Sequence, residues 1–184
     1  PPATIRRQRQ MCIRDSYNNI QLKLFITTPL LSEIKSDASG DIEITSMNLD
    51  NLSIMVAGSG NITVENDINI TQQTNLESDG SGNINIETLT TNALNAQVQG
   101  SGNIEVESGS TDELDVLVDG SGNVKLFGLA STACTVASDG SGDTRVNVTD
   151  NLDVTISGSG DVEYIGNPTI NITDDGSGNL IDAN

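Results

Sequence analysis

The chain contains no histidine and no tryptophan, and its 184 residues include only two phenylalanines, two tyrosines and two cysteines. Without histidine, a histidine-ligated metal site and a Ser-His-Asp triad are both excluded. Basic side chains are also scarce: 8 Lys and Arg stand against 26 Asp and Glu, a formal net charge of −18. A surface of that sign repels a phosphate backbone, so we expect no nucleic-acid partner. No apolar run approaches the roughly 18 residues of a membrane-spanning helix, so we expect no transmembrane segment.

Half of the basic residues lie in the first 16 positions (PPATIRRQRQMCIRDS). Without this segment, residues 17–184 hold 4 basic and 25 acidic side chains, a net charge of −21. No apolar stretch of roughly 7–15 residues follows the arginines, so the segment is not a secretory signal. We interpret residues 1–16 as a non-native or disordered tail and residues 17–184 as a single domain.

Glycine, in contrast, is abundant and regularly placed. The dipeptide Ser-Gly followed by Asn or Asp occurs eight times, at spacings of 20, 22, 20, 20, 20, 18 and 18 residues, and seven copies read GSG. The second glycines of these turns are Gly40, Gly60, Gly82, Gly102, Gly122, Gly142, Gly160 and Gly178. A period near 20 residues predicts a repeat architecture in which each unit packs on its neighbours.

Apolar residues alternate with polar ones on both sides of each Ser-Gly. The positions two and four residues after the glycine are mostly Ile, Val or Leu. All eight positions six residues before it are apolar: Ile34, Ile54, Leu76, Ala96, Val116, Val136, Val154 and Ile172. This alternation indicates short strands with one buried face, and the glycines between them are expected to supply the positive φ of a tight turn. Stretches such as 109–112 and 166–168 predict a second turn on the far side of each unit.

A unit of two short strands and two turns cannot bury its own apolar face, but stacked units can. The sequence therefore predicts an all-β solenoid of about 20 residues per coil, with parallel pairing between coils about 4.8 Å apart and the GSG turns along one edge. About eight coils would form a rod of roughly 40 Å. An antiparallel sandwich or barrel also yields regular short strands, but it does not require one tripeptide at the same phase in every unit.

The repeated pattern GSG-[N/D]-[I/V]-x-[I/V] resembles the head GIN domain of putative auto-transporter adhesins, a bacterial family. Residues 23–30 (KLFITTPL) and the closing Gly166-Asn167-Pro168 also resemble that family, so the similarity covers about residues 20–184. It implies a right-handed, single-stranded parallel β-helix like that of pectin lyases, export to the periplasm or cell surface, and adhesion to a surface glycan or to a host or cell-envelope protein. It further implies that the N-terminal part of the family domain, with any export signal, is missing. The family has no agreed catalytic residues to transfer.

The residue after each Ser-Gly is always Asn or Asp: Asp41, Asn61, Asn83, Asn103, Asn123, Asp143, Asp161 and Asn179. Stacked in a solenoid, these residues would form a ladder whose amides bond along the axis. The alternative is calcium, held by Asp119 and Asp139 in one phase or by Asp143 and Asp161 in another, because stacked carboxylates repel unless protonated or bridged by a cation. The nine-residue aspartate repeat of calcium-binding β-rolls is absent, so these four residues are weak metal candidates and no cofactor is expected.

Other candidate sites have structural explanations. A phosphate-binding glycine loop needs a helix after it, and here a strand pattern follows each GSG. Cys134 shares its phase with Leu52, Leu94, Leu114 and Leu152, which predicts a buried thiol. The basic residues beyond the tail, Lys23, Lys35, Lys125 and Arg145, are expected to be too few and too scattered for a polyanion groove.

Three functions are compatible with this pattern: a non-enzymatic adhesin-like or scaffold solenoid, a carbohydrate-binding module, and a pectin-lyase-like enzyme acting on polysaccharides. The enzyme would need an acid cluster or a basic residue that breaks the repeat on one face. The long unit 60–82 is the main irregularity, and it adds mostly the polar residues 71–74 (TQQT). We therefore expect no catalytic residues and favour the first function.

The predicted inside–outside register can be tested with two adjacent substitutions. Val116→Asp would bury an unpartnered carboxylate between Ala96 and Val136, which typically costs several kcal/mol. Asp115→Asn, one position away on the outer face, should be nearly neutral. Thermal melts of the two variants measure the difference, and equal melting temperatures would show that the register is wrong.

Overall fold

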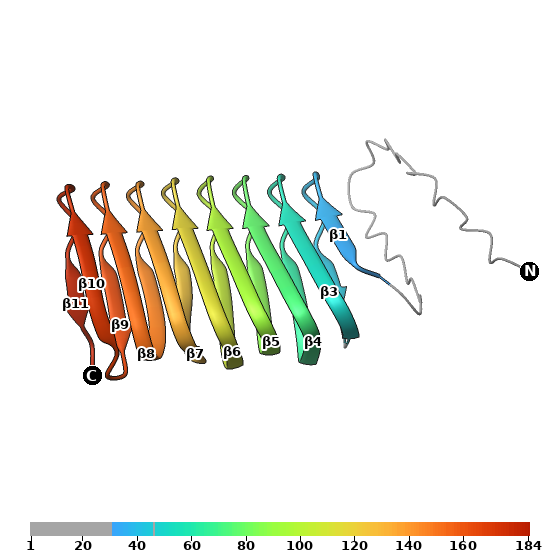
Figure 1. Cartoon of the computed structure of the whole chain (residues 1–184). Coiled ribbons are helices and arrows are strands. Elements are labelled where there is room, and N and C mark those ends of the chain that lie inside the picture. The colour runs from blue at the N-terminus through green and yellow to red at the C-terminus, as the bar shows by residue number, and fades with distance from the viewer. Residues whose placement is uncertain (1–30, 46) are drawn as a thin grey trace, which may run out of the picture.

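The computed structural model describes residues 31–45 and 47–184, and the predicted tail lies outside these ranges. The described residues form no helix that could span a membrane. They form eleven strands: β1 (Glu33–Ser36), β2 (Ile42–Ile44), β3 (Met47–Val56), β4 (Ile62–Ser78), β5 (Ile84–Val98), β6 (Ile104–Val118), β7 (Val124–Ser138), β8 (Thr144–Ile156), β9 (Val162–Ile165), β10 (Thr169–Asp174) and β11 (Leu180–Asp182). All of their pairings are parallel, and the coils stack side by side into a rod with the Ser-Gly turns along one edge (Figure 1). The predicted β-solenoid is confirmed.

Register between coils follows the repeat residue by residue. Val116, for example, pairs with Ala96 on one side and with Val136 on the other. The same column continues to Ile34 at one end of the rod and to Ile172 at the other. In-register stacking of equivalent residues is therefore what converts the 20-residue period into continuous columns.

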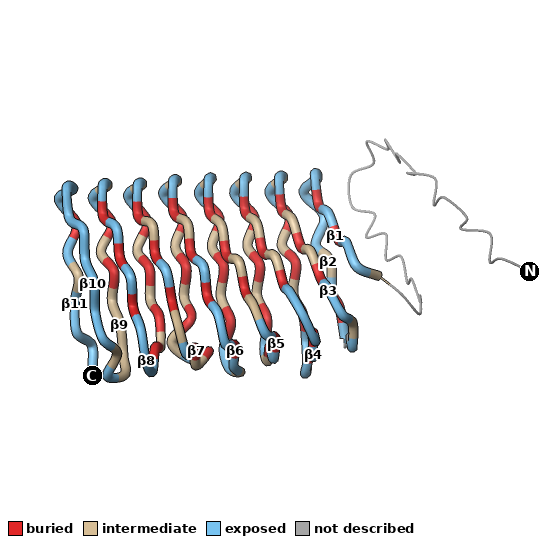
Figure 2. The backbone as a smooth tube through the Cα atoms, in the orientation of Figure 1, coloured by how far each residue is buried: buried red, intermediate tan, exposed pale blue. Residues whose placement is uncertain are grey.

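The columns that point inward form the core. In β5, Ile84, Ile86 and Leu89 line one wall, and Leu94, Ala96 and Val98 line the opposite wall, all at most 1% exposed. Buried positions alternate with outward ones along every central coil (Figure 2). Cys134 lies in the same interior column as Leu114 and Leu152, as predicted, and burial raises the pKa of its thiol. This cysteine is an unreactive core residue.

The column of residues that lie six positions before each Ser-Gly glycine departs from the prediction at its last member, Ile172. Ile172 is 44% exposed, whereas the seven earlier members are 7% exposed or less. Ile172 lies on β10 in the last described coil, which pairs only with β8. An inward-pointing side chain there has no coil on its far side, so its position in the repeat does not bury it.

The second turn predicted on the far side of each coil takes the form of a bend within a continuous strand in the central coils. Each of β4 to β8 runs unbroken for 13–17 residues, and residues 109–112 lie inside β6. Parallel stacking pairs each corner residue with a corner residue of the next coil, so the chain bends without leaving the hydrogen-bonded ladder. Gly109 permits one such bend with φ of +134°, and the strand is interrupted at this edge in the end coils, between β2 and β3 and between β9 and β10.

The glycines of the Ser-Gly turns serve a purpose different from the one predicted. None has a positive φ; among the described glycines, only Gly109 and Gly166 do. Instead, each turn glycine after the first lies directly against the backbone of the previous coil, so that a Cβ on Gly122 would overlap the carbonyl oxygen of Gly102. Ser121 N donates to Gly100 O over 2.9 Å across the same gap. Close backbone stacking is therefore what excludes a side chain.

This contact predicts that glycine-to-alanine substitutions differ along the edge. Gly122→Ala should force the backbones apart and lower the free energy of unfolding by about 1–3 kcal/mol, the usual cost of overpacking. Gly40→Ala is the matched control, because no atom of the described residues lies within 4 Å of the place that its Cβ would occupy. Urea unfolding of both variants measures the difference; equal midpoints would contradict the stacking explanation.

Candidate functional site

The Asn/Asp row after the turns forms the predicted ladder. Along its asparagine steps, one side-chain oxygen accepts both the backbone N–H and the side-chain amide of the residue one coil further on. For Asn83 and Asn103 these two distances are 2.9 and 2.8 Å, and for Asn103 and Asn123 they are 3.0 and 2.9 Å. The ladder is a structural clamp that holds the turns in register.

The ladder weakens where aspartate replaces asparagine on consecutive coils. Asp143 N donates to Asn123 Oδ1 over 2.8 Å and Asp161 N donates to Asp143 Oδ1 over 3.1 Å, but neither step has an amide bond. Asp119 and Asp139 lie exposed on the turns, also on consecutive coils. No three acidic or cysteine side chains in the described ranges gather in a way that could hold a metal ion. Calcium binding at these four aspartates stays a prediction.

A second outward row lies two residues further along each coil and carries the charges. Its central members pair in register in the order Glu105, Lys125, Arg145, Glu163. The Lys125 Nζ lies 3.6 Å from a Glu105 oxygen, and Arg145 donates through Nε and one Nη to the two oxygens of Glu163, each over 3.2 Å. The order of signs along the axis is thus acid, base, base, acid.

The expectation that the basic residues are scattered is wrong for Lys125 and Arg145. They are 20 residues apart in the sequence, which is the period of the repeat, so they occupy equivalent positions on adjacent coils. The spacing itself was the signal that could have placed them together. Like charges opposite each other in a sheet are destabilising, and the two flanking glutamates offset this repulsion.

A recess opens beside the two basic side chains. It has a volume of about 90 Å³ and is lined by Asn123, Lys125, Asp143 and Arg145. An ammonium group offers three donors and a guanidinium five; Glu163 engages two of the Arg145 donors, whereas Glu105 lies 3.6 Å from the Lys125 nitrogen, beyond hydrogen-bond distance. Unfilled N–H groups therefore remain on both side chains, each about 41% exposed.

Phe127 lies two residues beyond Lys125 on β7 and is not one of the residues that line the recess. It lies at the register shift between Leu126 and Ala130, where β7 has residues with no partner in β8. The side-chain amide of Asn147 closes the gap by donating to the Phe127 carbonyl over 3.1 Å. A half-buried aromatic residue thus follows Lys125 closely along the coil.

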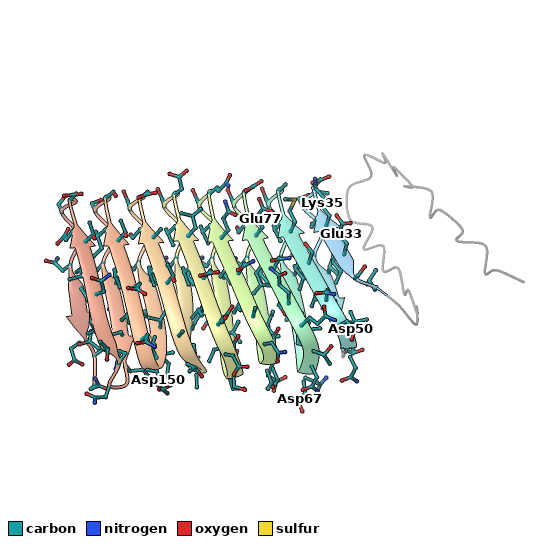
Figure 3. The ribbon with its side chains drawn as sticks, in the orientation of Figure 1. Glu33, Lys35, Asp50, Asp67, Glu77 and Asp150 are labelled. Atoms are coloured by element: carbon teal, nitrogen blue, oxygen red, sulfur yellow. The ribbon has the colours of Figure 1, made fainter. Side chains whose placement is uncertain are left out.

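Acidic residues dominate the neighbouring surface. Glu65, Glu87 and Glu107 line a recess of about 190 Å³ on the preceding coils. Acidic side chains also stand at both edges of the rod, with Glu77 toward the Ser-Gly edge and Asp50, Asp67 and Asp150 toward the other (Figure 3). Partial burial raises the pKa of Glu77, and the negative charge of the nearby Asp79 raises it further. Lys125 and Arg145 are therefore an isolated cationic spot on an acidic protein.

Comparison with known proteins identifies a family and a shared fold. The sequence model of the family described as "Putative auto-transporter adhesin, head GIN domain" matches residues 4–168. No curated protein sequence matches the chain. A putative adhesin from Parabacteroides distasonis superposes with a TM-score of 0.74 at 24% identity, over 82% of this chain and 63% of that one.

Two further solved structures extend the comparison. A putative adhesin from Bacteroides fragilis has a TM-score of 0.72 and 21% identity, over 81% of this chain and 90% of that one. A putative lipid binding protein from Parabacteroides distasonis has a TM-score of 0.70 and 31% identity, over 83% and 62% respectively. The chain thus spans less than two thirds of both Parabacteroides distasonis proteins.

Exchanging Asn and Asp in the ladder should shift stability in opposite directions. Asn103→Asp removes the amide that donates to Asn83 and should cost about 0.5–1.5 kcal/mol. Asp143→Asn supplies the amide missing opposite Asn123 and separates two stacked carboxylates, so it should stabilise by a similar amount. Chemical unfolding at neutral pH measures both variants, and shifts of the same sign would contradict this view of the ladder.

Proposed function

Because the chain belongs to the head GIN domain family of putative auto-transporter adhesins, we propose that it is a non-enzymatic, adhesin-like binding module. We place it at the cell surface or in the periplasm, as the family description suggests. Its role is to present a rigid, regularly spaced surface to a partner. The carbohydrate-binding alternative is compatible with this role and specifies the partner.

The observation that supports the proposal is the small size and the polar lining of the best-formed recesses in the described ranges. Enzyme sites are usually clefts that exclude water and position a few polar groups. The two recesses found in the described chain have volumes of about 90 and 190 Å³ and are lined mainly by charged and amide side chains. Glu77, the carboxyl group whose pKa is raised, lines neither of them. This arrangement favours surface recognition over catalysis.

The similarity to a putative lipid binding protein suggests a different ligand, which the interior of this chain disfavours. Columns of aliphatic side chains, mostly 0–3% exposed, fill the space between the two walls of the coil. An acyl chain would have to bind outside, and a net charge of −18 repels an anionic bilayer. Among the outer features, the two basic residues beside Phe127 favour a glycan instead.

Binding and catalysis can be tested on the whole chain. Fluorescently labelled protein should bind saturably to host epithelial cells or to a glycan array. The same preparation, incubated with pectate, hyaluronan and neutral polysaccharides, should release no reducing ends and no unsaturated sugars. Cleavage that disappears in Glu77→Gln or in another single carboxylate variant would overturn the non-enzymatic function, and failure to bind any cell or glycan would overturn the adhesive one.

A further inference from the structure

We propose that Lys125 and Arg145 form a binding site for the carboxylate of one acidic sugar residue within an otherwise neutral glycan. This inference rests on the proposed binding function and names its ligand. The site comprises the two basic side chains and the recess that they line together with Asn123 and Asp143.

The order of charges along the row marks the position of the ligand. A row built only for stability would alternate acid and base, because opposite charges attract their neighbours across the sheet. Here the two bases are adjacent, about 4.8 Å apart along the axis, and each engages the glutamate on its far side. The repulsion is therefore concentrated between Lys125 and Arg145, where an anion would relieve it.

The donors that remain unfilled suit a carboxylate. Arg145 uses Nε and one Nη on Glu163 and keeps its other Nη group, and the Lys125 ammonium lies 3.6 Å from a Glu105 oxygen, too far for a hydrogen bond. Charge-assisted bonds from such groups to a carboxylate are the stronger kind of hydrogen bond. The recess of about 90 Å³ admits a carboxylate but not a whole sugar ring, so the ring must lie outside it.

The surroundings determine what carries the carboxylate. Glu105 and Glu163 flank the site, and the whole chain has a charge of −18, so a polyanion or an anionic bilayer is repelled. A single acidic sugar among neutral ones avoids most of this repulsion. Phe127, half-buried and two residues beyond Lys125 on β7, is the aromatic side chain that we expect the C–H groups of the sugar ring to pack against.

One residue of the recess opposes the ligand. Asp143 lines it together with the two cations, and its Oδ1 accepts the backbone N–H of Asp161. Its negative charge lowers the affinity for a carboxylate, as does the competition of Glu163 for Arg145. We therefore expect one such site to bind a carboxylate with low affinity. Removal of the charge on Asp143 or on Glu163 should raise that affinity.

The test is an NMR titration of the ¹⁵N-labelled whole chain with sialyllactose, with methyl glucuronide as a second acidic probe and lactose as the matched neutral sugar. Both acidic probes should shift the amide signals of residues 123–127 and 143–147, and lactose should leave them unchanged. Lys125→Gln or Arg145→Gln should raise the Kd for sialyllactose about tenfold, since each removes a charge-assisted bond. Asp143→Asn and Glu163→Gln should lower the Kd severalfold.

Lys35→Gln is the control, because Lys35 pairs with Asp37 at the far end of the rod and should leave the Kd unchanged. Melting temperatures of the variants separate loss of binding from loss of fold. The site is overturned if neither acidic probe shifts these signals, if the double variant Lys125→Gln/Arg145→Gln binds as wild type, or if only phosphatidylglycerol vesicles bind through the two cations.

The two proposals fail in different ways. If wild-type protein and the double variant adhere equally to cells, adhesion uses another face and only the site is wrong. If the acidic probes bind through Lys125 and Arg145 but the wild type adheres to no cell and no glycan surface, the site stands and the adhesive function is wrong.

Discussion

The close approach of successive backbones at the Ser-Gly edge is the constraint on which the rest of the structure depends. The turn glycines of one coil lie against the carbonyl groups of the coil before, leaving no room for a Cβ. Hydrogen bonds such as Gly120 N to Val98 O, at 3.2 Å, cross the same gap. Because this contact is repeated at every coil, each residue is placed over its equivalent. Inward aliphatic columns, the Asn/Asp ladder and the outward charged row all follow from that register.

The register also determines how a surface site arises in such a protein. Residues one period apart in the sequence become neighbours across about 4.8 Å, so any departure from the repeat creates a local patch. Lys125 and Arg145 are one departure, and the register shift that leaves Phe127 without a partner in β8 is another. Both occur where the coil length changes from 20 to 18 residues. The candidate binding site is thus located where the repeat becomes irregular.

Much of the fold could be predicted from the sequence, because all eight units share one pattern of apolar and polar positions counted from the Ser-Gly dipeptide. The inward columns, the buried Cys134 and the amide ladder followed from counting residues from each Ser-Gly. The turn glycines were explained wrongly, since sequence shows that a side chain is excluded but not whether φ or a neighbouring backbone excludes it. The exposure of Ile172 depends on what lies beyond a coil, which no local pattern encodes. The adjacency of Lys125 and Arg145 is predictable from their separation of 20 residues, which equals the period of the repeat.

Hydrogen-bond scalar couplings measured by NMR test the in-register parallel stacking most directly. A long-range HNCO experiment on labelled protein detects the coupling between a donor nitrogen and the carbonyl carbon that accepts its hydrogen bond. Stacking predicts cross-peaks from Ser121 N to the Gly100 carbonyl and from Ile104 N to the Asn123 carbonyl, which the structure places at 2.9 and 3.0 Å. Couplings that connect neighbouring repeats in antiparallel order, or in a register shifted by one residue, would contradict the account.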